Sequence, residues 1–513
     1  MSFLEIVIFL LLCAVALGWL SRRAGLPYPI ALVLGGGALG FMPKLPQIEF
    51  DPQFLLVLVL PPILYQAALL TSWRDFKANL RPIGLLAIGL VIVTTLALGA
   101  ALKFLIADIP WAVAFAFGAI VSPPDAVAAT AILSKMNMPR RIVTVLEGES
   151  LVNDASGLVL YKFAVAAALS GVFSLFEASV QFVLVSVGGI AIGMLLAGVF
   201  VALHRFLGDP FIEVLLSLAV PYLAYVAAES VHVSGVLAVV AAGLLRGRYS
   251  PRMVSAEMRI LARSAWNVLV FMLNSLIFIL IGLQLSDIVS RLEGYTGWEL
   301  AADGLAVSMV AILVRFGWVY FAEYLPAWLG RLAGKETSPP LPGEAFVVSW
   351  CGMRGIVSLA AAAALPAGIA YRDLLVFLTF VVILVTLVMQ GVTLAPLIRR
   401  VKLGTDHSTR DELRLARMAM GKAALAALER AAGEGGALPE VIERIRAELA
   451  EHMAAASPLA EMPDSSHAHA TRVRLAAVRA ARDELIRLWQ EGTISDEVLH
   501  HIEEELDYDE SRL

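Results

Sequence analysis

Two segments of this sequence place carboxylates inside long apolar stretches. One is Ser122-Pro123-Pro124-Asp125, and the other is Glu149-Ser150-Leu151-Val152-Asn153-Asp154. A carboxylate inside a lipid bilayer is costly, so its presence there indicates a functional site. Two successive prolines interrupt a helix, and unwound backbone at membrane depth lines an ion or substrate cavity. Together the two segments predict an ion transporter.

The spacing of the second segment brings its polar side chains together. On a helix Glu149 and Asn153 share one face, and Ser150 and Asp154 share the neighbouring face, because each pair is four residues apart. Hard cations prefer oxygen ligands. The two segments supply such oxygen ligands from carboxylates, a hydroxyl, an amide and the carbonyls freed beside Asp125. They therefore predict a site for a monovalent cation. The alternative is that Asp154 is only a hydrogen-bonded buried acid.

Two arginines also lie inside apolar stretches. Arg315 lies in the middle of one, and Arg354 lies between the two glycines of Gly352-Met353-Arg354-Gly355. A buried cation needs a partner. The available acids are Glu149, Asp125 and Asp154. The alternatives are that Arg315 extends to the membrane surface and that Arg354 neutralises the carbonyl ends of a broken helix.

Composition indicates a chain that is mostly embedded in a membrane. Of its 513 residues 59% are hydrophobic and 16% are charged, far less charge than a soluble chain carries. A helix needs about 20 apolar residues to cross a bilayer. The expected spans are 2–20, 28–42, 52–70, 81–106, 110–133, 142–170, 174–203, 211–231, 233–246, 264–288, 299–328, 343–367 and 373–399. Lys162, Glu213 and Glu229 lie near span ends, where we expect solvated side chains.

The loops between these spans predict the orientation of the chain. Lysine and arginine concentrate in alternate loops, such as 246–263 and 399–402, which are therefore expected to face the cytoplasm. This orientation places the N-terminus outside and the C-terminal tail in the cytoplasm. The interruptions near 122–125 and 352–355 are seven spans apart, so they run in opposite directions through the membrane. Such an inverted pair indicates a transporter site near the midplane.

The residues after about 403 form a second region of different composition. Residues 402–513 contain 22 acidic and 14 basic residues, whereas residues 1–401 contain 22 acidic and 25 basic residues. Thr409 and Glu412 form a capping box that opens a helix, and further helical patterns cover about 438–455, 468–491 and 495–506. The two cysteines of the chain predict neither a disulfide framework nor a cysteine metal site.

The motifs resemble those of the cation:proton antiporter-1 family, which comprises NhaP-type bacterial sodium/proton antiporters and animal sodium/hydrogen exchangers. Residues 149–154 are similar to the motif of the sixth helix of the family, and residues 122–128 are similar to its unwound fifth helix. Residues 352–355 match its unwound twelfth helix, and Arg315 matches the arginine of its eleventh helix. One position departs, because Gln66 stands where many relatives have an acid.

The resemblance implies an all-α membrane protein of about 13 transmembrane helices with inverted repeats, divided into core and dimerisation subdomains over residues 1–403. It implies that Asp154 binds the cation and the proton in turn, while Asp125, Ser150 and the backbone near Pro124 help to hold the cation. Glu149 and Arg315 are implied to form a structural ion pair. The implied protein is a homodimer in the bacterial inner membrane that exchanges one Na⁺ or Li⁺ for one H⁺ without a cofactor.

Other classes of function lack their sequence signatures. An exchanger of K⁺ for H⁺ is the nearest alternative, because ligand types alone do not separate the two cations. A cation channel is more distant, since no filter or charged ring is evident. A primary pump is disfavoured because the phosphate-binding motif G-x-x-x-x-G-K-[ST] does not occur. Neither an enzyme nor a nucleic-acid-binding protein is expected.

The acidic tail, residues 404–513, is predicted to regulate exchange and not to carry it out, because the membrane region contains the whole proposed ion site. Attraction between the tail and the basic inner loops is electrostatically plausible. A chain that ends at Leu403 should therefore retain exchange in proteoliposomes while its rate or pH profile changes. If this shortened chain inserts stably but shows no exchange at any pH, the tail is part of the transport cycle.

Overall fold

In the computed structural model, helices joined by turns and loops make up the part of the chain that it describes, with no strand among those residues. The described residues are 3–24, 27–42, 52–133, 136, 138–172, 174–204, 206–253, 256–292, 295–332, 342–401, 403, 408–433, 440, 442–447, 481, 484, 485, 487, 491 and 502.

Contacts divide the chain into two compact units, Met1–Thr405 and Asp406–Leu513. In the second unit α19 (Ser408–Gly433) begins one residue before the expected capping box and ends at the first glycine of the expected stop. Nearly all of the later expected helices lie outside the described residues.

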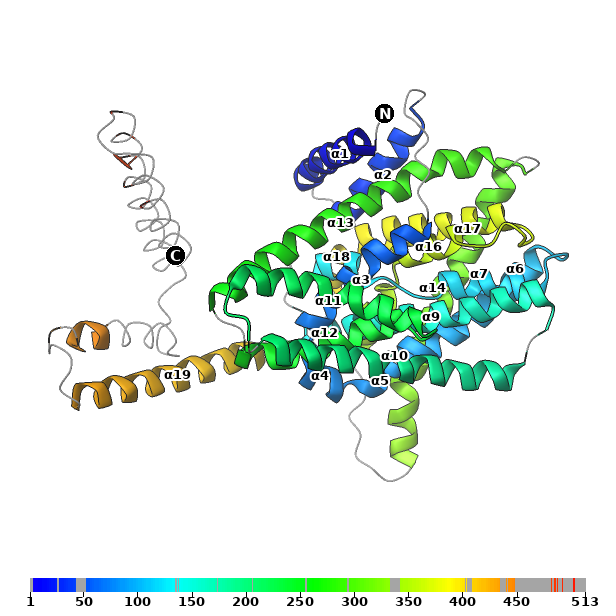
Figure 1. The fold of residues 1–513 in the computed structure, drawn as a ribbon. Helices are drawn as coiled ribbons and strands as arrows, with labels where there is room; N and C mark the ends of the chain where they lie inside the picture. Colours follow the sequence, from blue (N-terminus) through cyan, green and yellow to red (C-terminus); the bar gives the residue numbers. More distant parts are fainter. Residues whose placement is uncertain are drawn as a thin grey trace. The chain divides into compact units, whose positions relative to one another are not determined.

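Every expected span of the first unit coincides with a helix or an interrupted helix (Figure 1). The elements are α1 (Phe3–Ala24), α2 (Tyr28–Gly40), α3 (Pro52–Leu70), α4 (Trp73–Ala78), α5 (Leu80–Gly84), η1 (Leu85–Leu90), α6 (Val91–Leu105), α7 (Trp111–Val121), α8 (Ala126–Leu133), α9 (Arg140–Ser170), α10 (Leu175–His204), α11 (Pro210–Ser230), α12 (Gly235–Met253), α13 (Ala256–Ser290), α14 (Gly297–Leu332), α15 (Pro342–Trp350), α16 (Ile356–Ala363), α17 (Arg372–Val385), η2 (Thr386–Gln390) and α18 (Gly391–Arg400). Eight helical segments among the described residues are long and apolar enough to cross a membrane. The number thirteen stays a prediction.

The short helix α2 is shielded by its neighbour α13, along which it lies (Figure 1). Gly36 and Gly40 of α2 face the backbone carbonyls of Ile279 and Leu283, so closely that a methyl group on either glycine would overlap them. Small residues let helix backbones approach closely inside a membrane. This contact explains how a helix of 13 residues is accommodated in a membrane protein.

Both expected interruptions occur. Residues 122–125 separate α7 from α8, and residues 351–355 separate α15 from α16. A proline pair does not by itself produce such a break, because Pro61 and Pro62 lie inside the continuous helix α3. Two π-helical turns, η1 and η2, were not expected from the sequence. Such turns occur frequently at functional sites.

Helix α9 lies between the two hydrophobic cores of the membrane unit. Its residues Val145 and Leu146 belong to one buried cluster, whereas Leu151 and Ala155 belong to the other. Its apolar side chains therefore pack on both sides, and polar residues of its middle part, such as Glu149, Asn153 and Asp154, are enclosed by protein.

Candidate functional site

Helix α9 carries a polar row, which consists of Glu149, Ser150, Asn153 and Asp154. As the sequence predicts, this row is largely buried. Glu149 and Asn153 are at most 1% exposed and Asp154 is 7% exposed, while Ser150 is half-buried. Gly157, one turn further along, lies against the ring of Pro123, and a side chain there would collide with that ring. The close approach brings α9 against the unwound residues 122–125.

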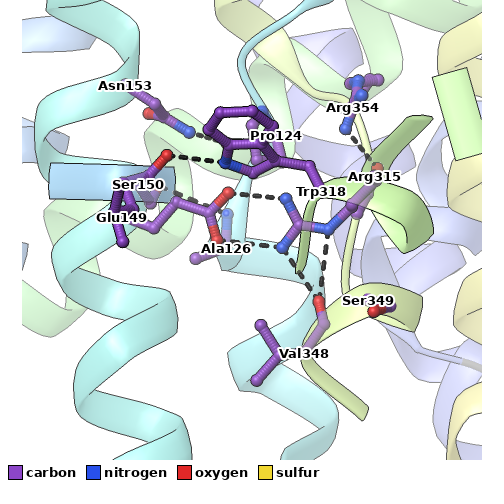
Figure 2. Close-up of polar contacts among 12 residues, drawn as sticks. Pro124, Ala126, Glu149, Ser150, Asn153, Arg315, Trp318, Val348, Ser349 and Arg354 are labelled. Carbon is purple, nitrogen blue, oxygen red and sulfur yellow. Dashed lines mark hydrogen bonds and ion pairs between the residues drawn. The ribbon is translucent and has the colours of Figure 1, made fainter. Parts of the chain in front are cut away.

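Side chains of α9 hold the backbone of this unwound segment (Figure 2). Asn153 Nδ2 donates a hydrogen bond of 2.8 Å to the carbonyl oxygen of Pro124. Ser150 Oγ accepts a longer one, 3.4 Å, from the backbone N–H of Ala126. A free backbone group inside a membrane is costly, so these contacts stabilise the break that the two prolines begin.

One oxygen of the row is left without a partner. Because the amide nitrogen of Asn153 donates to a carbonyl, its Oδ1 is fixed as the other atom of the amide. This Oδ1 is buried and has no hydrogen-bond partner among the described residues. A buried acceptor without a partner costs about 1–3 kcal/mol, and a bound cation would remove that cost.

Asp154 is buried and Asp125 is half-buried, and the charge of Asp125 repels that of Asp154. Two carboxylates that repel each other in this way cannot both be ionised at low cost. A proton or a cation between them relieves the repulsion. Two hydrogen bonds thus join α9 to the unwound segment, and these two segments contain the five residues predicted to bind the ion, namely Asp154, Asp125, Ser150, Asn153 and Pro124.

Glu149 and Arg315 form a buried, two-pronged ion pair (Figure 2). Arg315 Nη1 and Nη2 lie 2.6 and 2.9 Å from the two carboxylate oxygens, and both side chains are 1% exposed. Arg315 also donates from Nε and Nη2 to the carbonyl oxygen of Val348, at 3.2 and 3.0 Å. The pair joins α9, α14 and α15, and the alternative that Arg315 extends to the membrane surface is wrong.

Arg354 has a different environment from Arg315. It is 1% exposed, its Nη1 donates to the carbonyl oxygen of Gly352 at 2.6 Å, and its Nε has no hydrogen-bond partner among the described residues. Its backbone N–H donates to Thr386 Oγ1 of η2 at 3.1 Å. No carboxylate in the described part of the chain forms an ion pair with it. These contacts favour neutralisation of the carbonyls of the broken helix. Thr386 was not predicted as a partner of this segment.

The structure also describes four other polar positions that the sequence analysis considered. Glu213 was expected to be solvated, and this is wrong, because Glu213 is buried 3.4 Å from Nε2 of buried His204. Gln66 donates to Asn267 Oδ1 at 3.3 Å. Lys162 and Glu229 form an exposed pair at 3.4 Å, as expected for solvated side chains.

Comparison with known proteins gives one consistent family. A family model described as sodium/hydrogen exchanger, transmembrane, matches residues 7–400. An uncharacterized Na⁺/H⁺ exchanger of Mycobacterium tuberculosis is 35% identical over 528 residues, which cover 99% of this chain and 96% of that protein. A sodium, potassium, lithium and rubidium/H⁺ antiporter of Bacillus subtilis is 34% identical over 410 residues, covering 76% of this chain and 60% of that protein.

The fold is also similar to that of a solved structure. The sodium proton antiporter MjNhaP1 of Methanocaldococcus jannaschii superposes with a TM-score of 0.62 and 22% identity, covering 78% of this chain and 99% of that one. At this identity the likeness supports the helical fold.

Removing one partner of the buried ion pair should destabilise the protein. In Glu149→Gln the charge of Arg315 stays buried without its counter-charge, so the free energy of unfolding should fall by about 3–5 kcal/mol. The melting temperature and the yield of folded protein measure this change. Arg291→Gln is the matched control, because Arg291 pairs with Asp287 on the surface and such pairs contribute at most about 1 kcal/mol. Equal melting temperatures for both variants would contradict a structural role for the buried pair.

Proposed function

The chain belongs to the sodium/hydrogen exchanger family, and from this premise we propose how its buried site exchanges ions. It is a secondary active antiporter that exchanges Na⁺ for H⁺ across a membrane. Asp154 is the group that binds the two ions in turn. A proton and a cation compete for its carboxylate, so that release of one accompanies binding of the other.

The observation that carries this assignment is the burial of Asp154 in α9, where its charge interacts with that of Asp125 and the neighbouring residue Asn153 has an amide oxygen without a partner among the described residues. Protonation of Asp154 removes its repulsion with Asp125. A cation does the same, with oxygen ligands from both carboxylates, Ser150 Oγ and Asn153 Oδ1. Hard monovalent cations prefer such ligands. The carbonyl oxygen of Pro124, which already accepts from Asn153, has a second lone pair for the cation.

The charges buried around this site favour exchange of one ion for one proton. Glu149 and Arg315 neutralise each other. At Asp154 one bound Na⁺ and one bound proton each contribute a single positive charge. Either ion makes the Asp154 carboxylate neutral, and a neutral group crosses the membrane interior at the lowest cost. Both loaded states then carry the same charge, so the exchange is electroneutral.

Movement of the site between the two sides of the membrane requires one part of the protein to move against another. We assign the interrupted helices, α9 and α14 to a moving core, and the remaining long helices to a dimerisation part within a homodimer. We assign the N-terminus to the outer side and the tail to the cytoplasm, as the distribution of basic loops predicts. We assign the protein to the bacterial inner membrane.

Potassium is a second candidate substrate. The relative from Bacillus subtilis is named as an antiporter of sodium, potassium, lithium and rubidium. Gln66 is a neutral side chain that is hydrogen-bonded to Asn267, so it adds no negative charge near the site. Oxygen ligand types alone do not separate K⁺ from Na⁺. Exchange driven in turn by Na⁺, Li⁺ and K⁺ measures this preference.

Competition at one carboxylate predicts a definite pH dependence. As the pH falls, protons occupy Asp154 more often, so the Na⁺ concentration for half-maximal exchange should rise, by up to tenfold per pH unit where the proton dominates. Proteoliposomes with an internal pH-sensitive dye and no ATP measure this value. An imposed membrane voltage should leave the rate unchanged, and a strong acceleration by voltage would contradict electroneutral exchange.

Asp154→Asn should abolish exchange, because an amide neither takes up a proton nor carries a charge for the cation. Its melting transition should stay cooperative, since Asn fills the same volume. Glu177→Gln, which removes an exposed acid at the start of α10, is the matched control and should exchange normally. Normal exchange by Asp154→Asn would assign the ion site to other residues.

A further inference from the structure

The carboxylate of Asp125 lies in the space that a side chain on Gly355 would occupy. A methyl group added to Gly355 would lie 2.5 Å from both Cβ and Cγ of Asp125, and closer still to Oδ2. The backbone of Gly355 has φ −139° and ψ −149°, which is not the left-handed region. The position therefore requires glycine for space and not for its conformational freedom.

Asp125 connects the two interrupted helices at this point. Its Oδ1 accepts a hydrogen bond of 2.8 Å from the N–H of Val127, in the first turn of α8. Its Oδ2 lies against Gly355, which is the residue that caps the N-terminus of α16. Its own N–H donates to the carbonyl oxygen of Met353 at 2.7 Å. Helix N-termini carry partial positive charge, so both half-helices favour a carboxylate at this place.

The same carboxylate interacts electrostatically with Asp154. The position of the Asp125 carboxylate therefore depends on Gly355, and this position in turn affects how the cation is bound. The hydrogen bond from Val127 prevents Asp125 from withdrawing freely, because withdrawal would break the cap of α8.

We propose that Gly355 is a positioning residue of the ion site: by having no side chain it leaves the space in which the Asp125 carboxylate lies, between the two half-helix N-termini, and so fixes that carboxylate where it shares the cation with Asp154. The proposal rests on the proposed function in one respect, namely that Asp125 and Asp154 share the cation. Gly355 itself touches Asp125 and not the ion.

Gly355→Ala tests the proposal. The added methyl group displaces the carboxylate by about 1 Å or more, and a displacement of this size at a functional group costs roughly tenfold or more. The Na⁺ concentration that gives half of the maximal thermal stabilisation should rise by that factor, and so should the Na⁺ concentration for half-maximal exchange. The rate at saturating Na⁺ should fall much less, because the carboxylate of Asp154 is unchanged.

Two glycine variants separate positioning from packing. Gly198→Ala lies in α10 with no other atom near the new methyl group, and it should leave both Na⁺ values unchanged. Gly118→Ala lies one turn before the unwound segment, and its methyl group would overlap the backbone carbonyl of Thr95. It should lower the melting temperature without changing the Na⁺ concentration dependence. If Gly118→Ala shifts this dependence as much as Gly355→Ala does, general distortion explains the effect and the proposal is wrong.

A double substitution tests the contact even when Gly355→Ala folds poorly. In Asp125→Gly the atoms that the methyl group would meet are gone, so adding Gly355→Ala to this background should not lower the melting temperature further. An equal loss of stability from Gly355→Ala in both backgrounds would overturn the proposal. This melting comparison needs no transport. A wild-type protein that neither exchanges nor responds to Na⁺ would instead overturn the proposed function.

Discussion

The cost of bare polar groups inside a membrane is the constraint on which this structure depends. Two helices are interrupted there, and each interruption frees backbone groups that water cannot reach. The protein satisfies them mutually: the N–H of Asp125 donates to Met353, and Asn153 of α9 donates to Pro124. Arg354 donates to the carbonyl oxygen of Gly352. The two breaks are stable because they occur together, and α9 lies beside them.

The buried charges follow from the same constraint. Arg315 is neutralised by Glu149 and also satisfies the carbonyl oxygen of Val348, so it contributes to the packing of three helices and adds no net charge to the site. Asp154 is also buried, and its charge is the one that we propose a proton and a cation neutralise in turn. The charge of Arg315, which stabilises the packing of the helices, is therefore distinct from the charge of Asp154, which we assign to transport.

The sequence was sufficient for the helical spans and the two interruptions, because each has a local pattern. The buried charge of Arg315 demanded a partner but left three acids open, and only the resemblance to a known family indicated Glu149. The sequence was insufficient where the deciding contact comes from a distant segment. Nothing near Pro61 and Pro62 shows that α3 stays continuous there, while Pro123 and Pro124 break their helix with help from α9. The need for glycine at 355 likewise depends on a carboxylate 230 positions earlier in the chain. Burial of Glu213 depends on His204 of the neighbouring helix, which hydropathy does not indicate.

Proton release on Na⁺ binding tests the central claim most directly, namely that one carboxylate holds either ion. Purified protein in weakly buffered detergent solution is titrated with Na⁺, and the protons released per bound Na⁺ are counted over a range of pH. At pH values low enough for Asp154 to be protonated beforehand, the account predicts release approaching one proton per Na⁺, falling towards zero as the pH rises. Binding of Na⁺ with no proton release at any pH would contradict it, because cation and proton would then occupy separate sites.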